Sequence, residues 1–179
     1  MYVVSFLKNW LALIGLAILV SCSPAKPVTE QYQLNGNTMG TYYVVKFYSS
    51  DAPDLQALQQ LIDAELELVN DLMSTYRPDS ELMRFNRQQT TEPVTLTPQT
   101  AKVIAEAIRI GQQSGGILDV TVGPLVELWG FGARGRIEQA PSDTDIANTR
   151  AVVGYDKLTL TDNQLTKSVA ALAVDLSTI

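Results

Sequence analysis

One amphipathic helix constrains the fold of this chain more than any other feature of its sequence. Between Asp54 and Met73, apolar residues recur at three- and four-residue steps, and glutamates and glutamines fill the other face. The apolar positions are Leu55, Leu58, Ile62, Leu66, Val69, Leu72 and Met73. Because such a helix buries its stripe against another element, the pattern predicts a layered fold with a packed core. Pro53 suits the first turn, so we expect the helix to begin there.

Residues on both sides of this helix have strand patterns. Tyr32 to Tyr48 alternates in polarity, and Thr41–Tyr48 is rich in β-forming residues. Asn35-Gly36-Asn37 predicts a turn just before that strand. Further along, we expect the glycine-flanked strand Ile117–Val122, a hairpin over Lys157–Lys167 that turns at Asp162-Asn163, and the strand Ala170–Leu176.

Capping signals predict three more helices. They are a short helix over Glu81–Asn86 behind Asp79 or Ser80, a longer one from Thr97-Pro98 to Gly115-Gly116, and one from Ser142, with Asp145 completing a variant capping box, to about Val152. Helices interspersed with hairpins predict an α+β fold, in which helices pack on a mainly antiparallel sheet. The chain stops after a strand and a helix cap, so we expect an incomplete domain that continues in a longer protein.

The composition argues against several classes of function. The 179-residue chain has no histidine, which excludes Ser-His-Asp triads and histidine-ligated zinc within it. Its formal net charge of −6 argues against nucleic acid as a partner, because phosphate binding needs a basic surface. Any metal held by this chain would have oxygen ligands, which favours magnesium or calcium. The length fits one domain or a little more.

The N-terminus has the pattern of a lipoprotein signal. Lys8 precedes an apolar run, Trp10 to Val20, that is too short to span a bilayer comfortably. Leu19-Val20-Ser21-Cys22 resembles a bacterial lipobox, in which Cys22 becomes the lipid-modified first residue. We expect a signal peptide over residues 1–21, a proline-bearing tether over 22–30, and the folded domain over 31–179. The alternative is a plain membrane anchor with an incidental cysteine.

This signal predicts a protein that is lipid-anchored in the bacterial cell envelope and faces the periplasm. Ser23, where an aspartate would retain the protein in the inner membrane, favours the outer membrane without deciding between the two. Cys22 is the only cysteine, so the chain forms no intrachain disulfide.

Four short clusters have residues suited to a ligand, and each is also compatible with a structural role. Met39 suits a flat aromatic ligand, but a methionine suits a core equally. Tyr76 offers a ring beside two hydroxyls at the end of the long helix. Ile117–Val122, with Asp119 inside it, forms either a ledge between glycine pairs or a tight connection in which Asp119 is a turn or capping residue. Asp175 lies beside hydroxyls at a strand end, where binding residues cluster.

Several blocks of residues follow one another in a specific order. They are Met39-Gly40-Thr41; Met73 to Leu82 with Arg84-Phe85-Asn86; Asp119 to Val126 with Leu128-Trp129-Gly130-Phe131-Gly132; and Val174 to Ile179. This series, which covers Gly36 to Ile179, resembles the ApbE family of FAD:protein FMN transferases, once described as thiamine-biosynthesis lipoproteins. The Thr-Val-Gly-Pro and Leu-Trp-Gly-Phe-Gly blocks are its specific parts, and the lipobox agrees with it.

The resemblance implies an enzyme that splits FAD at its pyrophosphate with Mg²⁺. It attaches FMN to a threonine hydroxyl of a partner protein by a phosphoester bond and releases AMP; some relatives mainly hydrolyse FAD instead. The implied acceptors are subunits of membrane-bound, ion-pumping redox complexes. The implied FAD contacts are Met39, Tyr76, Ile117, Leu118, Asp119 and Asp175. Many members have phenylalanine where this chain has Leu118, so the resemblance does not support ring stacking there.

The resemblance also places the family's magnesium ligands beyond Ile179, and it assigns no catalytic residue within the chain. A fragment over residues 23–179 is therefore predicted not to bind Mg²⁺ properly or turn over FAD. Trp129 is a candidate neighbour of the adenine, although we expect it to pack in the core. One rival hypothesis is a non-catalytic flavin-binding or partner-docking lipoprotein. Another is an exported α+β lipoprotein with a structural role.

Overall fold

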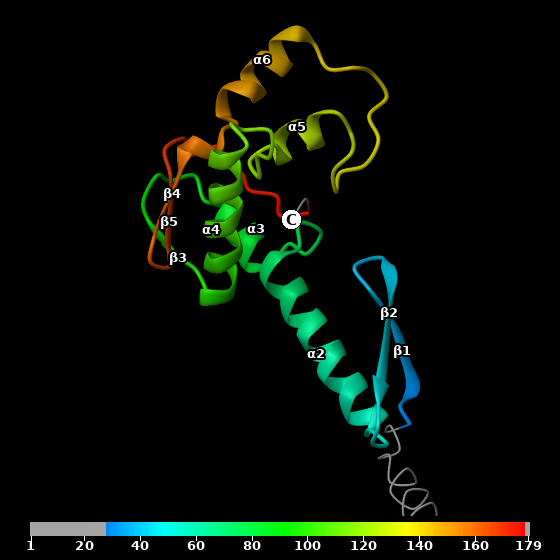
Figure 1. The fold of residues 1–179 in the computed structure, drawn as a ribbon. Helices are drawn as coiled ribbons and strands as arrows, with labels where there is room; N and C mark the ends of the chain where they lie inside the picture. Colours follow the sequence, from blue (N-terminus) through cyan, green and yellow to red (C-terminus); the bar gives the residue numbers. More distant parts are fainter. Residues whose placement is uncertain (1–27, 178–179) are drawn as a thin grey trace, which may run out of the picture.

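The computed structural model describes residues 28–177. Figure 1 shows a β-hairpin and a long helix that project from a second group of helices and short strands. The elements are β1 (Glu30–Thr38), β2 (Thr41–Ser49), α2 (Leu55–Met73), α3 (Glu81–Arg87), β3 (Val94–Thr95), α4 (Pro98–Gln113), α5 (Gly123–Leu128), α6 (Asp143–Val152), the 3-10 helix η1 (Tyr155–Lys157), β4 (Leu158–Thr161) and β5 (Gln164–Lys167). Cys22 and the predicted signal peptide lie outside the described residues.

The projecting group begins with the antiparallel hairpin of β1 and β2. Its turn consists of Met39 and Gly40, which both have positive φ, at 49° and 72°. The turn predicted at Asn35-Gly36-Asn37 is therefore wrong, because β1 continues through these residues. Gly36 serves the strand pairing instead: it lies opposite Tyr43, and a Cβ there would lie 2.7 Å from the tyrosine ring.

Helix α2 lies along this hairpin and confirms the predicted helix. Asp54 caps it by accepting a hydrogen bond from the Ala57 amide at 3.0 Å, so Pro53 precedes the helix instead of opening its first turn. The Tyr43 hydroxyl donates to the Asp63 carboxylate, which ties β2 to α2. Several positions of the apolar stripe are only half-buried, namely Leu58, Ile62, Leu66, Val69, Leu72 and Met73.

The second group contains a three-stranded antiparallel sheet in the order β3–β5–β4. Strands β4 and β5 confirm the hairpin predicted over Lys157–Lys167, with its turn at Asp162 and Asn163. Side chains from α3, α4, strands β4 and β5, and three segments that connect or follow these elements form the core: Leu82, Phe85, Leu96, Ala101, Ile104, Ala107, Val120, Leu158, Leu165, Leu172, Val174 and Leu176.

Side-chain caps start helices α3, α4 and α6 at the predicted residues. Ser80, Thr97 and Ser142 each accept a hydrogen bond from the backbone amide three residues later, at 3.0, 3.4 and 3.2 Å. The Asp145 carboxylate accepts a hydrogen bond from the Ser142 amide, which completes the capping box of α6. Each of these caps joins residues close in sequence, which is why the sequence pattern is sufficient to identify them.

Two of the predicted strands are wrong. Residues 117–122 form bends and turns between α4 and α5, and residues 170–176 form an irregular segment that belongs to no sheet. Alternate side chains of the second segment are buried, which accounts for its strand-like pattern. Its backbone bonds to the Asn86 side chain and to the Val120 carbonyl, and neither belongs to a strand. Periodicity reports which side chains are buried and does not report what the backbone pairs with.

The fold is α+β with antiparallel strands, as predicted, but the strands are divided between a two-stranded and a three-stranded sheet. Within residues 28–177, none of the helices has both the length and the apolar character needed to cross a membrane.

Candidate functional site

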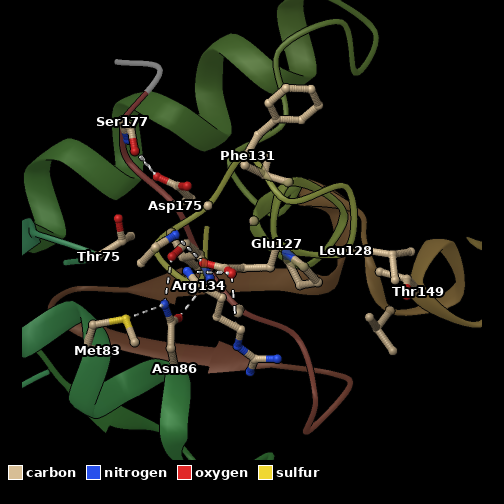
Figure 2. Close-up of a pocket in the computed structure, with 18 of the residues that line it drawn as sticks. Thr75, Met83, Asn86, Glu127, Leu128, Phe131, Arg134, Thr149, Asp175 and Ser177 are labelled. Carbon is tan, nitrogen blue, oxygen red and sulfur yellow. Dashed lines mark hydrogen bonds and ion pairs between the residues drawn. The ribbon is translucent and has the colours of Figure 1, made fainter. Parts of the chain in front are cut away.

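A cavity of about 1170 Å³ lies between α3, α5, α6 and the segment 171–177 (Figure 2). Binding cavities for small molecules and cofactors measure roughly 300–1,000 Å³, so this one is large enough for a dinucleotide-sized ligand. Its charged and aromatic lining residues are Tyr76, Arg87, Glu127, Phe131, Arg134, Arg136 and Asp175.

Asp175 reaches the cavity from a segment that is held on both edges. Its amide donates to the Val120 carbonyl at 2.7 Å, and the Asn86 side chain bonds to the residue before it. The Asp175 carboxylate accepts from the Ser177 amide at 2.9 Å and also from the Ser177 hydroxyl, as Figure 2 shows. Gly123 opens α5 beside it, and a Cβ there would lie 3.2 Å from the Asp175 Cβ. The backbone therefore determines where this carboxylate lies.

Tyr76 lies on the loop between α2 and α3, and 70% of it is exposed. The buried Ser80 hydroxyl donates to the Ser74 carbonyl at 2.7 Å and closes this loop. Arg77 pairs with Glu67 of α2 at 2.7 Å, and this hydrogen bond raises the pKa of Arg77. The loop is thus anchored on both sides of Tyr76, which leaves an exposed ring that suits stacking on a flat ligand.

Glu127 of α5 holds the loop that follows this helix. Its carboxylate accepts from the amides of Ala133 at 2.7 Å and Arg134 at 3.2 Å. Gly132 lies directly against this carboxylate, and a Cβ at that position would overlap it. The loop leaves Phe131 79% exposed on the cavity wall. The glycine after the phenylalanine is therefore explained by the space that Glu127 occupies.

Asp119 joins two loops outside the cavity lining. One carboxylate oxygen accepts from the Thr121 amide at 2.8 Å and from the Thr121 hydroxyl at 2.6 Å. The other oxygen accepts from the Tyr155 amide at 3.0 Å. The Thr121 hydroxyl accepts from the Gly154 amide at 2.7 Å, so the turn after α4 is bound to the start of η1. In this structure the carboxylate has a structural role, the one that the sequence left open beside ligand binding.

The structure brings Tyr76 and Asp175 to one cavity and leaves the other predicted FAD contacts outside its lining. Met39 is 54% exposed and lines a separate shallow hollow at the tip of the β1–β2 hairpin. Ile117 is 91% exposed and Leu118 is half-buried, and both lie in the turn that contains Asp119. Contact between FAD and each of the six residues stays a prediction.

Two residues that support the cavity were not singled out from the sequence, and one expectation was wrong. Asn86 and Glu127 hold the segments that carry Asp175 and Phe131. Glu127 had a usable signal, because an acid stands just before a loop with three glycines. Asn86 belongs to a block that indicated the family, but nothing in the sequence indicated which backbone its side chain would bond to. Trp129 is 43% exposed, so it does not pack in the core as expected.

Within residues 28–177, no three histidine, cysteine, aspartate or glutamate side chains gather closely enough to hold a metal ion. The two carboxylates that line the cavity, Glu127 and Asp175, both accept hydrogen bonds from their own loops.

Comparison with known proteins shows which family this chain resembles. The sequence model of the ApbE family matches residues 39–179. The FAD:protein FMN transferase of Vibrio cholerae is 48% identical over 175 residues, which are 97% of this chain and 52% of that protein. The protein of the same name from Haemophilus influenzae is 42% identical, over 93% of this chain and 50% of its own length. The chain thus spans about half the length of the curated relatives it matches.

Solved structures agree with this similarity. The flavin transferase ApbE from Vibrio cholerae superposes with a TM-score of 0.81 at 48% identity, over 85% of this chain and 50% of that one. The apo form of the Pseudomonas stutzeri flavinyl transferase ApbE superposes with a TM-score of 0.78 at 33% identity, over 84% and 48%.

Proposed function

The chain belongs to the ApbE family, and on that premise we propose that the protein transfers FMN from FAD to a hydroxyl group of a partner protein. The observation that carries the proposal is the 48% identity to a FAD:protein FMN transferase over 97% of this chain. The cavity supports it, because its volume and its exposed Tyr76 ring suit a flat dinucleotide.

The proposed reaction joins the FMN phosphorus to a threonine oxygen of the acceptor. The bond between this phosphorus and the bridging oxygen of the pyrophosphate breaks, AMP leaves with that oxygen, and the hydroxyl proton is lost to the AMP phosphate or to solvent. Such a transfer depends on positioning and on neutralising charge more than on covalent participation of the protein. We propose that Mg²⁺ supplies this neutralisation, through ligands beyond residue 179.

Within the chain we propose that Tyr76 stacks on a ring of FAD and that Asp175 accepts hydrogen bonds from it. Met39, Ile117, Leu118 and Asp119 complete the proposed contacts. For the partner, we propose a subunit of a membrane redox complex. We also propose that an acylated Cys22 anchors the protein in the bacterial envelope, facing the periplasm. A Cys22→Ala variant that still labels with radioactive palmitate would contradict that anchor.

The function is tested by incubating the full-length protein with FAD, Mg²⁺ and a candidate acceptor subunit. The expected result is an acceptor whose intact mass increases by one FMN phosphoester, with AMP released in equal amount. Chelation of Mg²⁺ by EDTA, and replacement of the acceptor threonine by alanine, should each abolish the adduct. A protein that is stabilised by FAD but forms no adduct and no AMP would instead be the non-catalytic flavin-binding lipoprotein. One that shows neither response would overturn the proposal.

A further inference from the structure

Asn86 makes with Val174 the pair of hydrogen bonds that a neighbouring strand would make. Its side-chain amide nitrogen donates to the Val174 carbonyl, and its side-chain oxygen accepts from the Val174 amide, both at 2.8 Å. The two residues are 88 positions apart in the chain. Figure 2 shows Asn86 reaching from α3 toward the segment that carries Asp175 and Ser177.

The opposite edge of the same segment is bonded as well. The Asp175 amide donates to the Val120 carbonyl at 2.7 Å, so the segment lies between a side chain on one edge and a loop on the other. Leu172, Val174 and Leu176 are buried in the core, and Asp175 lines the cavity. The segment thus has the environment of a central strand without belonging to a sheet.

We propose that Asn86 is a positioning residue, which holds Asp175 in the geometry that binds the flavin nucleotide; this rests on the proposed function. Val174 is almost fully buried at 1% exposure, and buried backbone groups that lack a partner are costly. An asparagine presents one donor and one acceptor side by side, which is what this backbone needs. Without that pair, the segment would detach for part of the time, and ligand affinity falls by the fraction of protein that remains competent.

The matched change is Asn86→Asp in the full-length protein, because it keeps the shape and replaces the donor with an acceptor. At pH 8 the carboxylate faces the Val174 carbonyl and repels it. At pH 5 a protonated carboxyl group can again donate and accept, because a carboxylate that faces an acceptor has a raised pKa. Asn86→Ser removes the pair without adding a charge, so its effect should not depend on pH. Asn163→Asp adds the same charge at the β4–β5 turn, away from the cavity lining.

Two measurements on each variant are compared with wild type at the same pH, which cancels the titration of all other groups. The first is amide exchange at Val174 and Asp175, and the second is the Kd for FAD. For Asn86→Asp at pH 8 we expect Kd to be about tenfold higher, which means that about one tenth of the protein remains competent to bind. Exchange at the two amides should then be faster by about tenfold or more. At pH 5 both should return to within about twofold of wild type. Asn86→Ser should show the loss at both pH values, and Asn163→Asp at neither.

Unchanged exchange at Val174 in Asn86→Asp and in Asn86→Ser would overturn the proposal. So would faster exchange without any loss of FAD affinity, because Asn86 would then stabilise the fold only. A wild-type protein that binds no FAD would refute the proposed function, and the positioning of a flavin nucleotide would be refuted with it. The exchange data would in that case still report whether Asn86 holds the segment, which distinguishes the two failures.

Discussion

Replacing Gly132 with alanine should release the loop that Glu127 holds on the cavity wall. The added Cβ would overlap the Glu127 carboxylate, which must then move away. Gly132 does not have the positive φ of Gly130 and Gly135, so alanine meets no backbone strain there. The substitution therefore acts through one displaced side chain.

The expected cost follows from the hydrogen bonds that Glu127 loses. Its carboxylate accepts from two backbone amides at 2.7 and 3.2 Å, and 31% of its side chain is exposed. Buried hydrogen bonds to a charged group contribute about 1.5–3 kcal/mol each, and where water reaches the site we take about 1 kcal/mol. The 4.0 Å pair with Arg134, whose side chain is 88% exposed, adds little. We expect a loss of about 2 kcal/mol in the free energy of unfolding.

Urea titration of the full-length protein measures this loss, and a double-mutant cycle with Glu127→Ala identifies its cause. Where Glu127 is already removed, Gly132→Ala has nothing to displace and should be neutral, or stabilise by about 0.5 kcal/mol through the unfolded chain. The coupling energy should therefore be about 2 kcal/mol. The FAD affinity should fall in both single variants, because the loop carries Phe131 on the cavity wall.

Additive costs of the two substitutions would refute the reasoning. They would mean that the alanine and the carboxylate do not compete for the same space.

Three further predictions concern residues away from that loop. Asp119→Ala removes the acceptor for three hydrogen bonds, so thermal unfolding should show a loss of about 2–3 kcal/mol in the free energy of unfolding, and FAD binding should weaken. If neither the stability nor the FAD affinity changes, Asp119 is a dispensable turn residue. Burial lowers the pKa of Lys167, so the folded state binds fewer protons than the unfolded chain below the ordinary lysine pKa of about 10.4. The unfolding free energy of wild type relative to Lys167→Met should therefore increase from pH 8 toward pH 10, and a constant difference would contradict the shift. Met39→Asn should maintain or raise Tm, because asparagine tolerates left-handed φ better than methionine, yet lower the FAD affinity in calorimetric titration if Met39 is a contact.

Much of the second group of elements could be predicted from the sequence because its signals are local. Ser80, Thr97 and Ser142 cap helices through amides three residues away, and a pattern of that length is visible in any window. The Asp162-Asn163 turn was also predictable, because it joins two strands that are adjacent in the sequence.

The two wrong strands mark where local signals end. Residues 117–122 and 170–176 are apolar and are bounded by turn residues, which is what a buried strand requires. Whether such a segment joins a sheet depends on the backbone that lies beside it. For the second segment that neighbour is the Asn86 side chain, and no periodicity encodes a partner of that kind.

The candidate site divides in the same way. The blocks that contain Tyr76 and Asp175 indicated the family, and the structure brings both residues to one cavity. The sequence did not indicate that the Asp119 carboxylate would accept hydrogen bonds from Thr121 and Tyr155, outside that cavity. A carboxylate has the same sequence signature whether it binds a ligand or a loop amide, so only its neighbours distinguish the two roles.

By itself, the sequence determined helices α2, α3, α4 and α6, the caps of the last three, the α+β class and the family, because periodicity, capping and ordered motifs act over a few residues. Only the tertiary structure decided that Asn86 would bond to Val174, 88 positions away, and that a Cβ at position 132 would overlap the Glu127 carboxylate. The physical reason is that hydrogen-bond partners and excluded volume depend on which groups the chain brings within about 3 Å of each other. The residues between Asn86 and Val174 in the sequence have no pattern that predicts this contact.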